Sequence, residues 1–111
     1  MEIPSIVIRV PEYSQAFVFG SVLFSNEPND FDMLIIYDET VCQPIDAYDK
    51  HKELCSSIRV LFNLPVHLTL LTHAEEQCVC FIEQTNAVPL DQALRSLRLT
   101  TRWHKNLVQD Q

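Results

Sequence analysis

A single glycine, Gly20, stands in this chain of 111 residues, although average usage of about 7% would supply about eight. It follows the apolar run Ala16–Phe19 and precedes Ser21, where an expected strand must turn. The chain makes its other turns without glycine. Gly20 is therefore expected to supply what other residues cannot, either a backbone with positive φ or room for a ligand that a Cβ would block.

Two aspartates, Asp30 and Asp32, follow this bend and lead into the apolar run Phe31–Tyr37. Successive strand residues point to opposite faces, so both carboxylates are expected on one face. Paired carboxylates suit Mg²⁺, which bridges them to substrate phosphates. If the two strands are neighbours, Gly20 and Ser21 lie beside the pair and offer backbone N–H groups and a hydroxyl to those phosphates. The alternative is a hairpin-like turn with two solvated aspartates.

The order of apolar segments predicts a small α/β (α+β) domain over residues 1–111, with a mixed β-sheet and helices packed mainly on one face. Strands are expected at 15–19, 31–37 and 66–71, with a short edge strand at 6–10. Helices are expected at 46–63, from the Thr72–Glu75 capping box to Thr85, and from about Pro89 onward. Their expected inner faces carry Tyr48, Cys55, Ile58, Leu61 and Phe62 in the first helix, and Ala74, Cys78, Phe81, Ile82 and Thr85 in the second.

Charge and apolar patterning exclude some classes of protein. The net charge of −7 argues against general wrapping of nucleic acid. No apolar run reaches the ~18 residues that span a bilayer, and the first residues lack a signal-peptide pattern, so a cytoplasmic protein without membrane contact is expected. The cysteines are then expected to be reduced, and Cys78 and Cys80 to be buried or half-buried on a helix rather than metal ligands. The four are Cys42, Cys55, Cys78 and Cys80.

Half of the eight basic residues fall near the end of the chain, on the expected C-terminal helical tail. They are Arg95, Arg98, Arg102 and Lys105, and their 3-4-3 spacing places them on one helical face. This face could bind RNA, the acidic surface of a partner, or the phosphates of a nucleotide. The alternative is a solvated face whose positive charge suits a helix C-terminus.

Over residues 16–71 the chain resembles the nucleotidyltransferase superfamily, and within it the minimal nucleotidyltransferase domain. The motifs that carry the resemblance are Phe19-Gly20-Ser21, then Asp30-x-Asp32 running into Met33-Leu34-Ile35. The resemblance implies a mixed sheet flanked by helices. It also implies transfer of a nucleoside monophosphate from a nucleoside triphosphate to an acceptor hydroxyl, with two Mg²⁺ ions. Gly20 and Ser21 would hold the triphosphate, with ATP the expected substrate, and Asp30 and Asp32 the metals.

Many minimal members of this family are antitoxins paired with an HEPN-type ribonuclease toxin, and some attach AMP groups to it. The resemblance therefore implies a protein partner of this kind. Two departures from the family pattern bear on activity. The interval 22–29 is short and has neither glycine nor arginine, and the position expected to carry a third carboxylate, in Val66-His67-Leu68, is His67.

His67 is a candidate general base or metal ligand, since a neutral imidazole can serve as either, although it is a poor ligand for Mg²⁺. The alternative is a histidine that is hydrogen-bonded at a strand edge. Glu75 and Glu76, just beyond the strand, are candidates for the missing carboxylate. Three functions follow: a Mg²⁺-dependent transferase, a weakened transferase fold that neutralises or regulates a partner by contact, or a nucleic-acid-binding regulator that uses the basic tail.

Overall fold

The computed structural model describes residues 8–97 of the chain. Arg98, Arg102 and Lys105 of the expected basic tail, and the first part of the expected edge strand at 6–10, lie outside this range. The described part of that segment, 8–10, forms no strand, which corrects the prediction.

The fold is built on a four-stranded mixed sheet in the order β3-β2-β1-β4, which confirms the predicted fold class. β1 pairs antiparallel with β2 and with β4, whereas β2 pairs parallel with β3. The parallel pair needs a long crossover, and helix α1 between β2 and β3 provides it. The strands are β1 (Ser14–Phe19), β2 (Phe31–Tyr37), β3 (Val66–Thr72) and β4 (Val88–Pro89).

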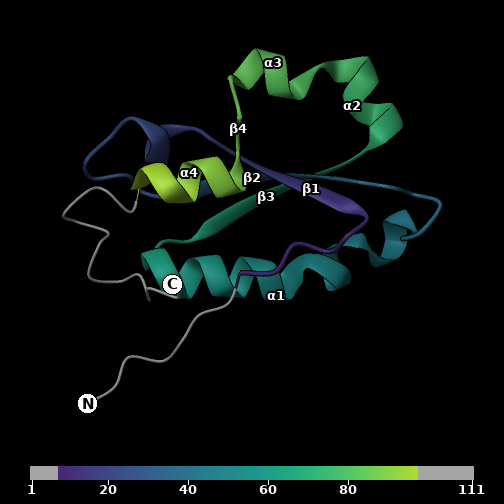
Figure 1. Ribbon diagram of the computed structural model, residues 1–111, viewed down its shortest axis with the longest axis horizontal. Coiled ribbons are helices and arrows are strands. Elements are labelled where there is room, and N and C mark those ends of the chain that lie inside the picture. Colours follow the sequence, from purple (N-terminus) through teal and green to yellow (C-terminus); the bar gives the residue numbers. More distant parts are fainter. Residues whose placement is uncertain (1–7, 98–111) are drawn as a thin grey trace.

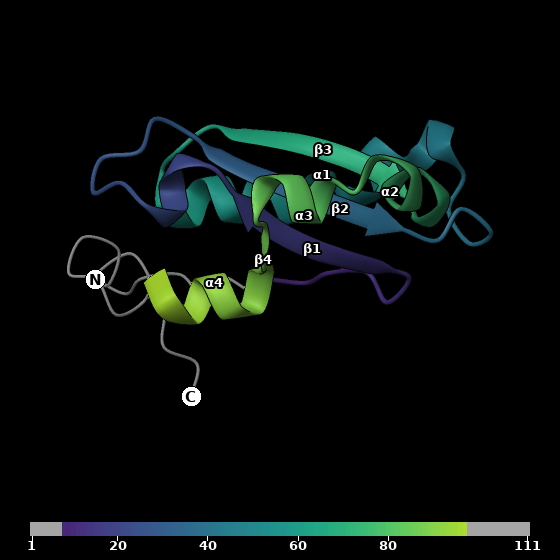
Figure 2. The ribbon, with the colours of Figure 1, turned by 90° about the horizontal axis from the view of Figure 1, so that it is seen from above.

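Helices lie on both sides of this sheet, but only two of them contribute buried side chains. In Figure 1, α1 runs beneath the sheet, and α2 and α3 lie above it. Figure 2 shows β3, β2 and β1 side by side, with α4 next to β1. No side chain of α2 or α3 is buried. The helices are α1 (Pro44–Phe62), α2 (His73–Val79), α3 (Phe81–Thr85) and α4 (Leu90–Leu97), and a 3₁₀ turn, η1 (Ser21–Leu23), follows β1.

The main core lies between the sheet and the helices α1 and α4. As the apolar run predicts, β2 is buried on both faces except at Asp32. The rings of Phe31 and Phe62 stack with centroids 5.0 Å apart and join β2 to the end of α1. The buried residues of this core are Ala16, Val18, Val22, Phe31, Met33, Ile35, Leu54, Ile58, Leu61, Phe62, Leu64, Leu90, Ala93 and Leu97. β2 is thus held in place beside its neighbours, which matters because it carries Asp32.

Several predictions of helix detail are wrong. The Thr72–Glu75 capping box forms, but the helix that it opens stops at Val79, because Cys80 adopts a left-handed conformation with φ 52°. Cys78 and Cys80 are exposed rather than half-buried. The last helix begins at Leu90, since Pro89 belongs to β4 and faces Phe17 of β1. On α1, Tyr48 is 63% exposed instead of packed in the core.

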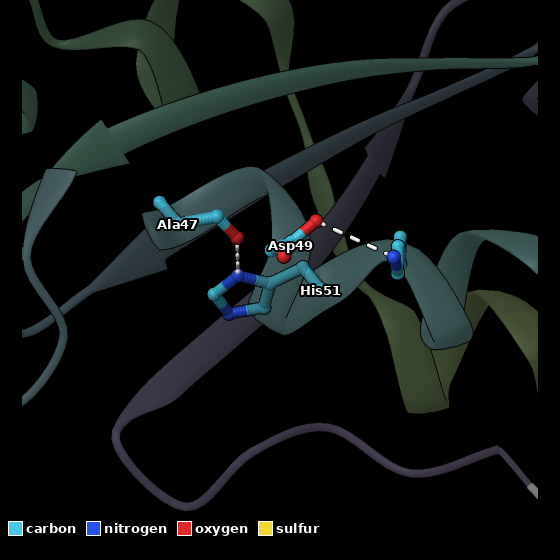
Figure 3. Close-up of polar contacts among 4 residues, drawn as sticks. Ala47, Asp49 and His51 are labelled. Atoms are coloured by element: carbon cyan, nitrogen blue, oxygen red, sulfur yellow. Dashed lines mark hydrogen bonds and ion pairs between the residues drawn. The ribbon is translucent and has the colours of Figure 1, made fainter. Parts of the chain in front are cut away.

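A fully buried histidine, His51, faces the sheet from α1. Figure 3 shows the contact of its Nδ1 with the carbonyl oxygen of Ala47. This distance is 2.7 Å, and its Nε2 lies 2.7 Å from the hydroxyl of Ser14. A carbonyl only accepts, so Nδ1 must carry the proton, and Nε2 accepts from the hydroxyl of Ser14. The rings of Tyr13 and Tyr37 flank the imidazole. His51 therefore links α1 to β1 by a satisfied polar contact within the core.

None of the helices within residues 8–97 is both long enough and apolar enough to cross a bilayer.

Candidate functional site

The sheet brings the bend at Gly20 together with Asp32 and His67. Asp32 lies opposite Phe19 in the antiparallel pair of β2 with β1, so it sits next to the residue that precedes Gly20. On its other side Asp32 lies opposite His67 in the parallel pair of β2 with β3. The bend after β1, the carboxylate of Asp32 on β2 and the imidazole of His67 on β3 thus lie side by side at the start of β2.

Gly20 adopts φ 86° and ψ −163°, a backbone region that essentially only glycine occupies. A Cβ built on it would overlap Oδ2 of Asp32 and would lie 3.2 Å from Cγ of the same side chain. The expected positive φ is confirmed, whereas the space that a Cβ would need is occupied by a side chain of the protein rather than by a ligand. The group that comes too close for a Cβ is the carboxylate of Asp32, so the sole glycine of the chain accommodates the proposed metal ligand.

Asp30, Asp32 and His67 form a cluster whose ligand atoms all lie within 4.8 Å of one another. Nδ1 of His67 is 3.3 Å from Oδ2 of Asp30 and 3.5 Å from Oδ1 of Asp32. The side chains of Asp30 and Asp32 are 27% and 22% exposed, whereas that of His67 is 64% exposed. This cluster could hold a metal ion, and its exposed side leaves room for water or a substrate to complete the coordination.

The electrostatics of Asp32 favour a bound cation. Partial burial raises the pKa of Asp32 above its ordinary value of 3.8, the neighbouring carboxylate of Asp30 raises it further, and His67 opposes both effects. Because the pKa in the folded protein exceeds that in the unfolded chain, the folded state binds more protons between the two values. The free energy of unfolding therefore falls as pH rises through that window. At neutral pH both carboxylates repel, and a metal ion would relieve the repulsion.

Ser21, the second residue predicted to hold phosphates, is exposed and begins η1 directly after Gly20. Its carbonyl accepts hydrogen bonds from the N–H groups of Phe24 and Ser25, at 3.0 and 2.8 Å, and so closes the turn. The bend is thus compact and lies beside Asp32.

Glu75 and Glu76 do not supply a third carboxylate. The side chain of Glu75 accepts the N–H of Thr72 in the capping box, at 2.9 Å. The carboxylate of Glu76 accepts the N–H groups of Phe81 and Ile82, at 3.0 and 3.2 Å, and so holds the start of α3. The third position of the cluster is therefore the imidazole of His67.

Other candidate features lie outside the cluster. Two surface hollows are lined by residues of the segment 8–16 with parts of α1, or with β4 and α4, and neither is lined by a member of the cluster. Of the four basic residues expected to share a face, the structure describes only Arg95, whose guanidinium lies 3.6 Å from the carboxylate of Asp91 one helical turn earlier. In residues 8–97 the cluster of Asp30, Asp32 and His67 is the one group with the spacing of metal ligands.

No family model, no curated protein and no solved structure matches the chain.

Proposed function

We propose that this protein is a metal-dependent nucleotidyltransferase that moves a nucleoside monophosphate from a nucleoside triphosphate to an acceptor hydroxyl. The observation that carries the proposal is the meeting of Gly20 with Asp32, in register with His67 on the next strand. A glycine bend beside paired carboxylates offers what phosphoryl chemistry needs, a backbone cradle for phosphates and ligands for a divalent ion.

Each residue has a role in this proposal. Asp30 and Asp32 would hold the divalent ions, expected to be two Mg²⁺ from the resemblance, which would neutralise charge on the phosphates. Gly20 and Ser21 would hold the β- and γ-phosphates at the bend. The acceptor oxygen attacks the α-phosphorus while its proton passes to His67. The bond from the α-phosphorus to the bridging oxygen breaks, and pyrophosphate leaves.

The proposed substrate is ATP, and the proposed acceptor is a hydroxyl on a partner protein in the cytoplasm. By resemblance this partner is an HEPN-type toxin, for which the present chain would be the antitoxin. One observation favours a second function: an exposed imidazole stands where the family pattern has a carboxylate. A site with one carboxylate fewer would bind Mg²⁺ less tightly and catalyse transfer less well, and such a protein could still neutralise its partner by contact alone.

Nucleotide transfer tests the first function. The protein is incubated with ATP labelled at the α-phosphate, a divalent cation and a cell extract as the pool of acceptors. Replacing both carboxylates, Asp30→Asn/Asp32→Asn, keeps the shapes of the side chains and removes the metal ligands. We expect labelling of protein to fall at least about tenfold in this variant. Glu83→Gln, at an exposed acid on α3, is the matched control and should label like the wild type.

Equal labelling by the wild type and the double variant would refute the transferase. If neither labels any acceptor, while both bind the same protein from the extract, the contact-only function holds instead.

A further inference from the structure

We propose that the cluster of Asp30, Asp32 and His67 takes a first-row transition ion, such as Zn²⁺ or Co²⁺, in preference to Mg²⁺. This inference rests on the metal site of the proposed function, names the class of ion that the site selects, and makes His67 a ligand of that ion in place of the base. It follows from the spacing and the chemistry of three donor atoms in residues 8–97.

The spacing of the donors is that of ligands around one ion. The two distances from Nδ1 of His67 to the carboxylates, 3.3 and 3.5 Å, are longer than a good N–H···O hydrogen bond. Ligands that each lie about 2.1 Å from a shared ion are separated by ~3.0 Å at right angles and ~3.4 Å at tetrahedral angles. The imidazole therefore stands at such a distance from each carboxylate, and all three donor atoms lie within 4.8 Å of one another, close enough to converge on a single ion.

The donor set decides between ions. Mg²⁺ prefers oxygen ligands and binds imidazole poorly, whereas Zn²⁺ and Co²⁺ accept imidazole nitrogen together with carboxylate oxygen. The position of His67 is fixed by strand pairing, because it lies in register with Asp32 on the neighbouring strand β3. The strand pairing places the nitrogen donor next to the carboxylates. The affinity of the site is therefore expected to be higher for Zn²⁺ or Co²⁺ than for Mg²⁺.

One contact holds the carboxylate of Asp32 in position for this ion. It fills the space that a Cβ on Gly20 would need, so it has a defined neighbour on one side. A dication bound by these carboxylates is also within reach of the imidazole of His67, a bond that Mg²⁺ would form only weakly.

The test is calorimetric titration of the full-length, metal-free protein with Zn²⁺, Co²⁺ and Mg²⁺ separately, with no nucleotide present. For the wild type we expect one Co²⁺ or Zn²⁺ per chain, at a dissociation constant at least about tenfold below that of Mg²⁺. His67→Asp restores an all-carboxylate set, so it should weaken Co²⁺ binding at least about tenfold and leave Mg²⁺ binding equal or stronger. His67→Asn, which removes the nitrogen donor but adds no charge, should weaken Co²⁺ binding similarly.

His73→Asn is the matched control, since His73 is an exposed histidine at the other end of β3 and should leave every affinity unchanged. The visible absorption of bound Co²⁺ provides a second readout and should change in His67→Asn but not in His73→Asn. Thermal melts of each variant separate loss of binding from loss of the fold.

The inference is overturned if Mg²⁺ binds as tightly as Co²⁺, if Co²⁺ binding survives Asp30→Asn/Asp32→Asn, or if His67→Asn binds Co²⁺ like the wild type. Because no nucleotide is used, these outcomes are independent of the transfer assay. Selective ion binding without nucleotide transfer would refute the proposed function and leave the present inference standing.

Discussion

Replacing Gly20 with alanine is expected to lower the free energy of unfolding by about 2–4 kcal/mol. Two costs add at this position. The backbone at φ 86° and ψ −163° is strained for any residue with a side chain, and the new Cβ would overlap the carboxylate of Asp32. The shift of Asp32 should also weaken metal binding. Urea unfolding measures the first effect, and calorimetry with Co²⁺ measures the second.

The two costs of Gly20→Ala can be separated. In Gly20→Ala/Asp32→Ala the carboxylate is absent, so the overlap is relieved while the backbone strain remains. We expect the double variant to recover about 0.5–3 kcal/mol relative to the sum of the single changes. Ser21→Ala, at the exposed next residue, should stay within about 0.5 kcal/mol of the wild type. If Gly20→Ala unfolds like the wild type, the close approach of Asp32 to the bend is wrong.

Replacing His51 with alanine is expected to cost about 2–4 kcal/mol of unfolding free energy. The imidazole is fully buried between Tyr13 and Tyr37, so its loss leaves a cavity. The hydroxyl of Ser14 also loses its acceptor. Ser14→Ala removes that hydrogen bond and little volume, and should cost only about 1 kcal/mol. Chemical denaturation with a probe of tertiary structure measures both changes.

The exposed histidine His73 offers the control for this prediction, and His73→Ala should change stability by less than about 0.5 kcal/mol. A change at His51 no larger than that at His73 would contradict the buried contact between α1 and β1.

The strands β1, β2 and β3 could be predicted from the sequence because apolar periodicity and strand burial agree, whereas β4 stands where the sequence predicts the start of a helix. The run at β2 is nearly all apolar, and the strand is buried on both faces. The capping box of Thr72 and Glu75 likewise acts over three residues and appears as expected. Local patterns of this kind need no knowledge of distant contacts.

Two features of the helices could not be predicted. The break at Cys80 is marked by neither glycine nor proline, and there the carboxylate of Glu76 accepts the N–H groups of Phe81 and Ile82, five and six residues further on. His51 lies one helical turn from Ala47 and from Leu54 on the buried face of α1, so its position indicates burial, but no local pattern indicates which group its ring contacts. Its burial depends on Ser14, 37 residues away in the sequence. A search for hydroxyl partners on neighbouring strands would be needed to find it.

The residues of the site could be predicted from the sequence more fully than the bounds of the helices. The rarity of glycine pointed to Gly20, and the alternation of extended chain at the start of β2 placed Asp30 and Asp32 together. The sequence did not reveal that Asp32 itself occupies the space above Gly20, because that contact depends on the pairing of Phe19 with Asp32. Positive φ elsewhere in residues 8–97 is carried by Asn63, Cys80 and Asn86, which explains how the chain manages with one glycine.

The most direct test of the account is calorimetric titration of a non-hydrolysable ATP analogue into the protein, with and without a divalent cation. We predict binding that requires the cation and disappears in Asp30→Asn/Asp32→Asn. Binding of equal strength in the presence of a chelator, or no binding under either condition, would contradict the claim. That claim is that the bend at Gly20 and the carboxylates of Asp30 and Asp32 bind a metal-bound triphosphate.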